Sequence, residues 1–408
     1  MRRPGRRVLY ISYDGVLEPL GESQVVAYLE RLADHAAIAL LSFEKPADLD
    51  RAQRVMTMRA RLERAGITWI PRQYHKQPPV LSTAFDIAAG CVTARRWARA
   101  AGAERCGIVH ARGYVPALVA LDVKRAHGAR FLFDMRGFWV DEKVEAGQWT
   151  RGGWLYRVGK WCERRLFAAA DAIVSLTEAG VREFSTLGHV RAGVPVSVIP
   201  TCADLDRFRP GLPDEQRRRA LGLEDAVVVG CVGTLSNWYL RGETLEYLAW
   251  LAQRIDRMKA LIVTREDHAL LRADAARHGL SGDRLVLTCA PFEEMPALIR
   301  LMDIGVFFIR ACFSKRASAA TKLAEFLGCG VPVVINDGIG DSGEIVRNGR
   351  VGVVLPDTTS TAFDASWEAF ASALADPQMP ERCRDLATRE YSLQRGVEAY
   401  AALYEQLS

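Results

Sequence analysis

The feature that most constrains the fold is a regular alternation of short apolar runs with longer segments of helical period. Amphipathic stretches such as 23–35 and 156–170 separate these runs along the whole chain. Strands that alternate with helices indicate parallel sheets covered by helices on both faces. We therefore expect an α/β protein with strands at 7–12, 37–43, 67–71, 107–111, 130–135, 172–176, 196–200, 226–233, 260–264, 284–288, 304–309, 331–336 and 351–355.

These thirteen strands fall into two successive sets. A single eight-stranded barrel needs eight even units in about 250 residues, so two Rossmann-like domains explain 408 residues better. The polar segment 201–223 contains prolines and glycines but no strand signal, and we place the boundary there. The expected domains are 1–204 and 205–390, and a C-terminal helix at 391–408 is expected to pack back on the N-terminal domain.

Composition narrows the class of protein. The net charge of +5 is too small to favour a nucleic-acid partner. Nine scattered cysteines without a CxxC pair indicate reduced interior residues of a cytosolic protein rather than a zinc site. No apolar run reaches the ~18 residues of a membrane span. The basic N-terminus and the segment 95–99 are better explained as solvated surface, and contact with a membrane is the alternative.

Ligands of open parallel sheets bind at the carboxyl ends of the strands, so the loops after the strands are the places to examine. After the first strand, Gly21, Glu22 and Ser23 lead into a helix that Glu22 or Ser23 can cap. The free N–H groups of that helix would bind an anion or a sugar. A simple turn with a helix cap is the alternative interpretation.

The next loops of the first half carry polar and aromatic side chains. His110 and Arg112 end the fourth strand, where an imidazole can bind a hydroxyl and a guanidinium can bind a phosphate or carboxylate. The loop 134–149 combines three aromatic residues with six charged ones. Indole rings and carboxylates in such a loop favour sugar binding, and a lid packed on the core is the alternative. The candidates there are Arg136, Trp139, Asp141 and Glu142.

In the second half, the loop after the eighth strand begins at Gly233, and Arg265 follows the ninth strand. After the eleventh strand, four cations precede or begin a helix that is expected to start between 318 and 321: Arg310, Lys315, Arg316 and Lys322. Free N–H groups, the helix dipole and these cations together predict a phosphate site. A solvated basic loop is the alternative.

Two stretches carry a family resemblance: "VIPTCADLDRFRP" at 198–210 and "TKLAEFLGCGVPVVINDGIGDSGEIV" at 321–346. They resemble the linker and the donor segment of family-4 retaining glycosyltransferases, and the resemblance covers essentially the whole chain. It implies the GT-B fold, in which two Rossmann-like domains face a central cleft. "YISYDGVLEPLGESQVVAYLERLA" and "DMRGFWVDE" further resemble a subgroup met in bacterial polysaccharide and surface-glycan gene clusters.

The resemblance implies a nucleotide-sugar donor, with UDP or GDP, and a glycan or lipid-linked acceptor. It implies no metal, no other cofactor and no nucleic-acid partner. Such enzymes are cytoplasmic or sit peripherally on the inner membrane face. By the same resemblance Glu325 binds the ribose hydroxyls, Lys322 faces the pyrophosphate or sugar, and His110 lies near the transferred sugar. The expected catalytic residues are His110, Arg112 and Lys322; the expected donor-binding residues are Gly233, Thr234, Arg265, Lys315, Arg316, Thr321 and Glu325.

The chain departs from the family pattern at three points. The first glutamate of the family's E-x7-E spacing would stand at Ala317, and no acid occurs between Arg310 and Glu325. Thr234 occupies the usual place of an arginine, and Trp238 and Tyr239 stand near the usual lysine. Other cations must then meet the donor phosphates. A non-catalytic binding or scaffold subunit and a nucleotide-sugar 2-epimerase therefore remain as alternative functions.

Overall fold

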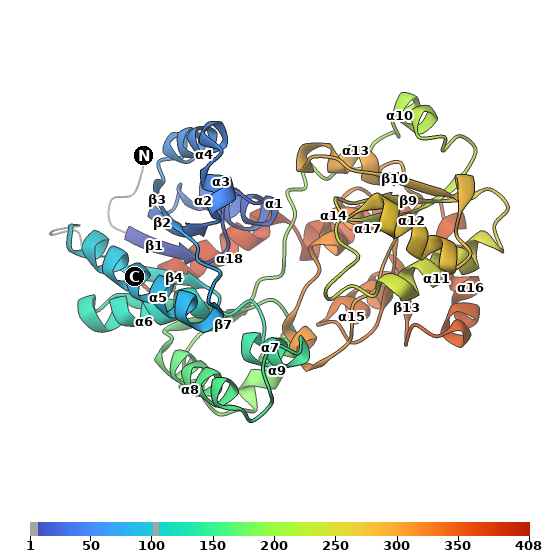
Figure 1. Cartoon of the computed structure of the whole chain (residues 1–408). Coiled ribbons are helices and arrows are strands. Elements are labelled where there is room, and N and C mark those ends of the chain that lie inside the picture. The colour runs from blue at the N-terminus through green and yellow to red at the C-terminus, as the bar shows by residue number, and fades with distance from the viewer. Residues whose placement is uncertain (1–6, 101–105) are drawn as a thin grey trace. The chain divides into compact units, whose positions relative to one another are not determined.

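The computed structural model describes residues 7–100 and 106–408, so the first residues of the basic N-terminus lie outside the described part. Two compact units are present. The first comprises the described part of Met1–Pro200 together with Arg316–Ser318 and Leu393–Ser408. The second comprises Thr201–Lys315 and Ala319–Ser392. Each unit is an α/β domain built on its own parallel sheet (Figure 1).

The sheet of the first unit has seven parallel strands in the order β3-β2-β1-β4-β5-β6-β7. The strands are β1 Arg7–Ser12, β2 Ala37–Glu44, β3 Thr68–Gln73, β4 Ile108–Arg112, β5 Arg130–Asp134, β6 Ala172–Ser175 and β7 Val196–Val198. The helices are α1 Pro19–Gly21, a π-helical turn Glu22–Val26, α2 Ala27–Leu32, α3 Pro46–Leu49, α4 Ala52–Arg64, α5 Pro79–Ala100, α6 Tyr114–His127, α7 Trp139–Glu145, α8 Trp154–Ala169, α9 Glu178–Ser185 and α18 Leu393–Gln406.

Helices cover both faces of this sheet because its strands are apolar on both sides. Helix α5 packs beside α6, and α6 packs beside α8, along one side of the sheet (Figure 1). Helix α18 packs against α2. Strand order reverses between β1 and β4, so the carboxyl ends of these two strands form the topological switch point of the first unit.

The sheet of the second unit has six parallel strands in the order β10-β9-β8-β11-β12-β13. The strands are β8 Val227–Val232, β9 Met258–Val263, β10 Leu285–Thr288, β11 Ile304–Phe307, β12 Val333–Asn336 and β13 Gly352–Leu355. The helices are α10 Glu215–Ala220, α11 Arg241–Ala252, α12 His268–Arg277, α13 Met295–Ile299, α14 Thr321–Gly328, α15 Ser342–Gly349, α16 Ser360–Ala375 and α17 Met379–Glu390, with 3-10 turns at Gly282–Arg284, Phe292–Glu294 and Phe313–Ala317. The switch point of this unit lies between β8 and β11.

All thirteen expected strands are present, and the α/β prediction is confirmed. One expected helix start is wrong. The first helical segment begins at Pro19 with Glu18 as its N-cap, so Glu22 and Ser23 lie inside the helix and cap nothing. Proline suits the first helical turn because its missing N–H would have no partner there. Gly21 is required for close packing, since a Cβ at this position would lie 2.0 Å from the Gly15 carbonyl oxygen.

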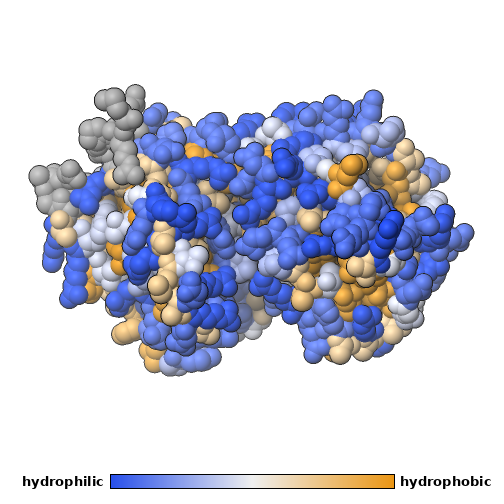
Figure 2. All heavy atoms as spheres, turned by 90° about the horizontal axis from the view of Figure 1, so that it is seen from above, coloured by the Kyte–Doolittle hydropathy of each residue, from blue (hydrophilic) through white to orange (hydrophobic). Residues whose placement is uncertain are grey.

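The surface seen in Figure 2 is mostly hydrophilic, with smaller apolar patches between the charged areas. None of the helices within residues 7–100 and 106–408 has the length and hydropathy needed to span a bilayer.

Candidate functional site

Two loops of the second unit meet at its switch point. The loop after β8 (233–240) and the loop after β11 (308–320) are joined by backbone hydrogen bonds. The Leu240 N–H donates to Phe308 O, and the Arg310 N–H donates to Trp238 O, both at 2.9 Å. Asn336 adds two hydrogen bonds of 2.8 Å to the backbone of Ile309. The backbone at this edge of the sheet is therefore fixed before any ligand binds.

Lys322 and Glu325 lie at the centre of this region, in the first turns of α14. Helix α14 begins at Thr321, within the range expected from the sequence. Lys322 is 9% and Glu325 8% exposed, which is unusual for charged side chains. Burial lowers the pKa of Lys322 to about 8, although Glu325 opposes this shift. Burial also raises the pKa of Glu325 to about 7, against the influence of Lys322.

Trp238 and Tyr239, which stand near the place of the expected lysine, hold cations in place. Lys322 Nζ lies 3.5 Å from the ring centre of Tyr239. Trp238 carries two cations, with Lys315 Nζ at 3.8 Å and the Arg310 guanidinium carbon at 4.6 Å from its ring centre. Ring faces attract cations electrostatically, so three positive charges gather beside the N-terminus of α14. The departure from the family pattern thus changes how positive charge is held and does not remove it.

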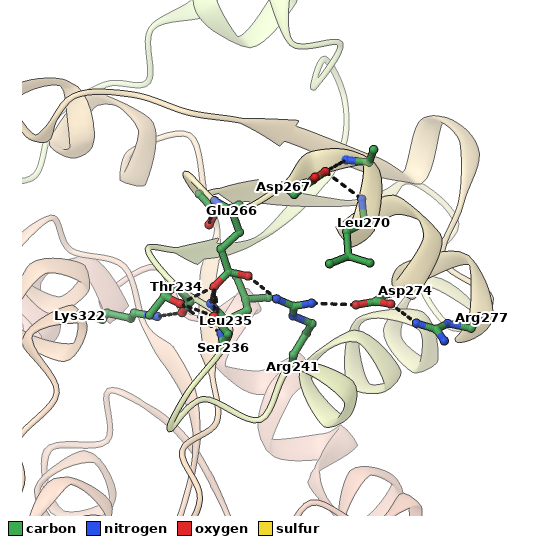
Figure 3. A network of polar contacts seen from close by, with 12 residues as sticks. Thr234, Leu235, Ser236, Arg241, Glu266, Asp267, Leu270, Asp274, Arg277 and Lys322 are labelled. Atoms are coloured by element: carbon green, nitrogen blue, oxygen red, sulfur yellow. Dashed lines mark hydrogen bonds and ion pairs between the residues drawn. The ribbon is translucent and has the colours of Figure 1, made fainter. Parts of the chain in front are cut away.

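The loop after β8 is organised by a carboxylate that the sequence analysis missed. Glu266 Oε1 accepts hydrogen bonds from Leu235 N at 2.9 Å and Ser236 N at 3.0 Å, and also from the hydroxyls of Ser236 and Thr234 (Figure 3). Its other oxygen pairs with Arg241 at 2.7 Å. Burial acts to raise the pKa of Glu266, but the hydrogen bonds from Ser236 and Thr234 outweigh it and lower the pKa to about 2.

This carboxylate also sets the position of Lys322. Thr234, whose side chain Glu266 binds, accepts a 2.8 Å hydrogen bond from Lys322 Nζ through its carbonyl oxygen (Figure 3). Gly233 has a φ of +77°, and a Cβ there would lie 3.3 Å from Lys322 Cε. A chain of contacts therefore runs from Glu266 through the loop to the ammonium group. Thr264–Asp267 directly follows β9, and this placement after a strand is the signal that could have identified Glu266.

The remaining expected donor residues are not all gathered here. Arg265, the neighbour of Glu266, is exposed. Arg316 is grouped with the first unit and pairs with Glu183 at 2.5 Å. Ala317, the position of the expected first glutamate, is fully buried, so an acidic side chain there would be enclosed. Of the expected set, Gly233, Thr234, Lys315, Thr321, Lys322 and Glu325 belong to the two loops and to α14.

In the first unit, charged side chains gather at the ends of β4 and β5. Asp134 Oδ2 lies 3.8 Å from His110 Nε2 and 3.9 Å from an Arg112 nitrogen, and Asp134 Oδ1 lies 3.8 Å from Arg136. These separations are too long for direct hydrogen bonds. Within the described residues, His110 Nε2, Arg112 Nε and Asp134 Oδ1 are buried and have no hydrogen-bond partner. Buried polar atoms without a partner are rare in proteins, so this cluster is a candidate functional position.

His110 itself is fully buried beneath aromatic rings. Its Nδ1 lies 2.8 Å from the hydroxyl of Tyr404, and Tyr10 and Tyr400 flank the imidazole. Burial lowers the pKa of His110, although Asp134 opposes the shift, so the imidazole is neutral at pH 7. Access of a sugar to His110 stays a prediction.

The aromatic loop after β5 contains helix α7 and packs against neighbouring elements. Trp139 begins α7, stacks on Tyr114 and meets Trp149 edge to face at 5.2 Å. Asp141 is buried and pairs with Lys160 at 2.5 Å. Glu142 follows Asp141 on α7. In the loop region after β1, the expected sugar-binding residue Glu22 instead pairs with Arg61 at 2.5 Å. Within the described residues, no group of three potential metal ligands is present.

A second carboxylate that the sequence analysis missed organises the loop after β1. Glu44, at the end of β2, accepts hydrogen bonds from Val16 N at 3.0 Å, Leu17 N at 3.1 Å and the Ser42 hydroxyl at 2.6 Å. It is fully buried, and burial raises its pKa despite the hydrogen bond from Ser42. Glu44 fixes the backbone that precedes Gly21.

Comparison with protein families accounts for both units. A glycosyl transferase 4-like domain matches residues 23–202, and glycosyl transferases group 1 matches residues 226–375. The chain belongs to the glycosyltransferases. The two matches span most of this glycosyltransferase, one in each unit. No curated protein sequence matches the chain significantly.

Solved structures share the fold over the full length. Sucrose-phosphate synthase from Thermosynechococcus elongatus superposes with a TM-score of 0.72 at 16% identity, covering 98% of this chain and 99% of its own. HepE from Anabaena, solved with UDP and glucose, gives 0.69 at 15% identity, covering 98% and 99%. A glycosyltransferase from Rickettsia africae gives 0.68 at 14% identity and covers 99% of both chains. These likenesses confirm the GT-B fold of the glycosyltransferase.

Proposed function

We propose that this glycosyltransferase transfers a sugar from a nucleotide-diphosphate sugar to an acceptor hydroxyl with retention of anomeric configuration. The second unit would bind the donor, and the first unit would bind a glycan or lipid-linked acceptor in bacterial polysaccharide or glycoconjugate biosynthesis. A cytoplasmic location, with peripheral contact with the inner membrane face, belongs to the same proposal. UDP is the first nucleotide to test because HepE was solved with UDP, and GDP is the second.

The observation that carries the proposal is the buried pair Lys322 and Glu325 at the start of α14. A carboxylate there can accept two hydroxyl hydrogen bonds from a ribose. The neighbouring ammonium and the free N–H groups of the helix suit the adjacent phosphates. Two opposite charges three residues apart match a ligand whose hydroxyl pair and phosphates are neighbours.

The chemistry follows from where negative charge develops. The acceptor oxygen forms a bond to the anomeric carbon as the bond from that carbon to the diphosphate oxygen breaks. Lys322, Lys315 and the N–H groups of α14 would stabilise the charge on the departing nucleoside diphosphate. The leaving phosphate can take the proton of the acceptor hydroxyl, so the step needs no separate protein base and no metal.

Thermal shift measurements test the donor site. UDP or GDP at ~100 times its dissociation constant should stabilise the protein by about 2.7 kcal/mol, which gives a measurable rise in Tm. Lys322→Ala and Glu325→Ala should each abolish this rise and sugar transfer while the proteins stay folded. Glu368→Gln, on an exposed position of α16, is the matched control and should behave as wild type.

Three outcomes would contradict the proposal. Undiminished turnover in both alanine variants would show that the donor does not bind at α14. Absence of any shift with UDP, GDP or their sugars would favour a scaffold subunit. Release of an isomerised nucleotide sugar without an acceptor would indicate an epimerase.

A further inference from the structure

Helix α8 of the first unit exposes large apolar side chains on one face. Trp154 is 67%, Val158 50% and Trp161 47% exposed. Their spacing of four and three residues places them in one row along the helix. The opposite side of α8 is buried through Gly159, Glu163, Leu166 and Phe167. The row is therefore a second apolar face on a helix whose core contacts are already made.

Cations accompany this row. Arg157, Arg164 and Arg165 are exposed on α8, and the Arg165 guanidinium carbon lies 4.0 Å from the ring centre of Trp161. The one acidic residue of α8, Glu163, is buried and pairs with Lys160. The exposed face of α8 thus combines indole rings with positive charge and carries no acid. Tryptophan and arginine on one helix face are typical of helices that lie in the interface of an anionic membrane.

Helix α5 repeats the arrangement on the same side of the sheet. Leu81 is 70%, Phe85 58% and Val92 50% exposed. Arg95, Arg96 and Arg99 follow towards its C-terminus, all exposed. The single acid of α5, Asp86, is 1% exposed and binds Tyr13 and His75. Helix α6 lies between α5 and α8 and contacts both, so the two exposed rows belong to one layer of helices (Figure 1).

The two helices have the same polarity along this layer. Helix α5 follows β3 and precedes β4, and α8 follows α7 and precedes β6, so both run back towards the amino edge of the sheet. The indole rings of α8 and the side chains of Leu81 and Phe85 on α5 stand in the first half of their helices, and most of the arginines stand in the second half; Arg157 and Val92 are the exceptions. The apolar end of the layer therefore lies on the side where an α/β sheet binds its ligand.

We propose that the exposed face of α5 and α8 docks on an anionic bilayer, with Trp154, Trp161, Leu81 and Phe85 inserted among the headgroups. The arginines would bind the acidic lipids. This surface deepens the proposed function and rests on it for its purpose, because a lipid-linked acceptor would then reach the carboxyl edge of the sheet from the membrane. A protein partner fits the face less well, since two rows of apolar side chains backed by like charges match a flat anionic layer.

Co-sedimentation with vesicles tests the surface. The full chain should bind phosphatidylcholine vesicles that contain 30% phosphatidylglycerol, and bind pure phosphatidylcholine much less. The double variant Trp154→Ser/Trp161→Ser should lose at least ten-fold in vesicle partitioning. Arg164→Gln/Arg165→Gln should lose a comparable amount on the acidic vesicles, since each arginine near an anionic surface contributes a factor of about five. Salt at 0.5 M should weaken the binding of the wild type.

Leu212→Ser is the matched control, because Leu212 is 92% exposed on the second unit and lies outside this face. It should bind vesicles as the wild type does. Equal binding by the tryptophan double variant, or no binding of the wild type to acidic vesicles, would overturn the proposal. A wild-type dimer that the double variant dissociates would instead assign the face to a second copy of the chain.

Nucleotide-induced thermal shifts measured on the same samples separate the two proposals. A normal nucleotide-induced rise in Tm without vesicle binding would contradict the proposed membrane surface only. Vesicle binding without a nucleotide-induced rise in Tm would contradict the proposed donor site only.

Discussion

In both units a glutamate side chain binds the backbone of the loop that follows the first strand, but the charges around the two glutamates differ. In the first unit, Glu44 at the end of β2 binds two successive N–H groups of the loop after β1. In the second unit, Glu266 after β9 binds two successive N–H groups of the loop after β8. Within the described residues, Glu44 pairs with no cation, whereas Glu266 pairs with Arg241 at 2.7 Å.

The difference shows what each loop is built to do. Glu44 is fully buried and burial raises its pKa, so it fixes backbone at the expense of holding a charge in the interior. Glu266 has a pKa of about 2 and stays ionised, and its loop contacts Lys322. The first loop is a structural anchor, and the second is part of a charged network that reaches the candidate donor site.

Among the variants that test this comparison, Glu266→Gln should have the largest effect on stability and on nucleotide affinity. The amide can no longer bind both the loop and Arg241 as a carboxylate does, so we expect a loss of about 2 kcal/mol in the free energy of unfolding at pH 7. Nucleotide affinity should fall about ten-fold, because the carbonyl partner of Lys322 shifts with the loop. Chemical denaturation and calorimetry with UDP measure the two quantities.

Glu293→Gln is the control, since Glu293 is an exposed carboxylate of the same unit. Higher nucleotide affinity in Glu266→Gln, with stability unchanged, would contradict this account and make Glu266 a competitor of the donor phosphates.

These two glutamates also show where sequence reasoning ends. The strands could be predicted because parallel strands buried on both faces read as short apolar runs. The start of α14 could be predicted from its position after a strand and before the Lys322–Glu325 pair. The placement of Glu266 after a strand marks it as a candidate, but the loop that Glu44 or Glu266 binds could not be predicted, because each partner lies about 30 residues earlier in the chain. That pairing depends on which strands lie side by side.

Contacts between segments distant in the sequence also explain other differences between the predicted and the observed site. Arg265 was expected at the donor site, but it is exposed, and its neighbour Glu266 binds the loop after β8. The first helical segment begins at Pro19, earlier than the glycine turn predicts, because proline suits the first turn of a helix. The roles of Trp238 and Tyr239 depend on three cations that come from the loop after β11 and from α14, far from both rings in the sequence.

A smaller effect should follow from Trp238→Leu. This variant keeps the apolar contact with the core but removes the ring face that holds Lys315 and Arg310. A cation–π contact at a partly exposed site contributes about 0.5–1 kcal/mol. We therefore expect nucleotide affinity to fall about three- to ten-fold, with a steeper dependence on salt because the cations are less well fixed. Calorimetry with UDP at two salt concentrations measures this.

Trp238→Phe keeps a ring and should recover most of the affinity. Equal weakening by Phe and Leu would show that the size of the indole matters and its ring face does not.

The smallest expected effect concerns the pH dependence of Glu44→Gln. A carboxyl group whose pKa is raised by folding contributes most stability at low pH and loses it as the pH rises above its unfolded value of about 4.5. The amide does not titrate, so the deficit in Tm of Glu44→Gln relative to wild type should shrink by the order of 2 °C between pH 5 and 8.

The pKa of Glu266 shifts in the opposite direction. Its pKa is lowered to about 2, so its contribution is complete above pH 4.5 and the deficit of Glu266→Gln should be constant over the same range. Melting curves of the three proteins at pH 5, 6, 7 and 8 compare the two directly. A deficit for Glu44→Gln that grows with pH would mean that the folded protein favours the ionised form of Glu44, and the two loops would then use their carboxylates in the same way.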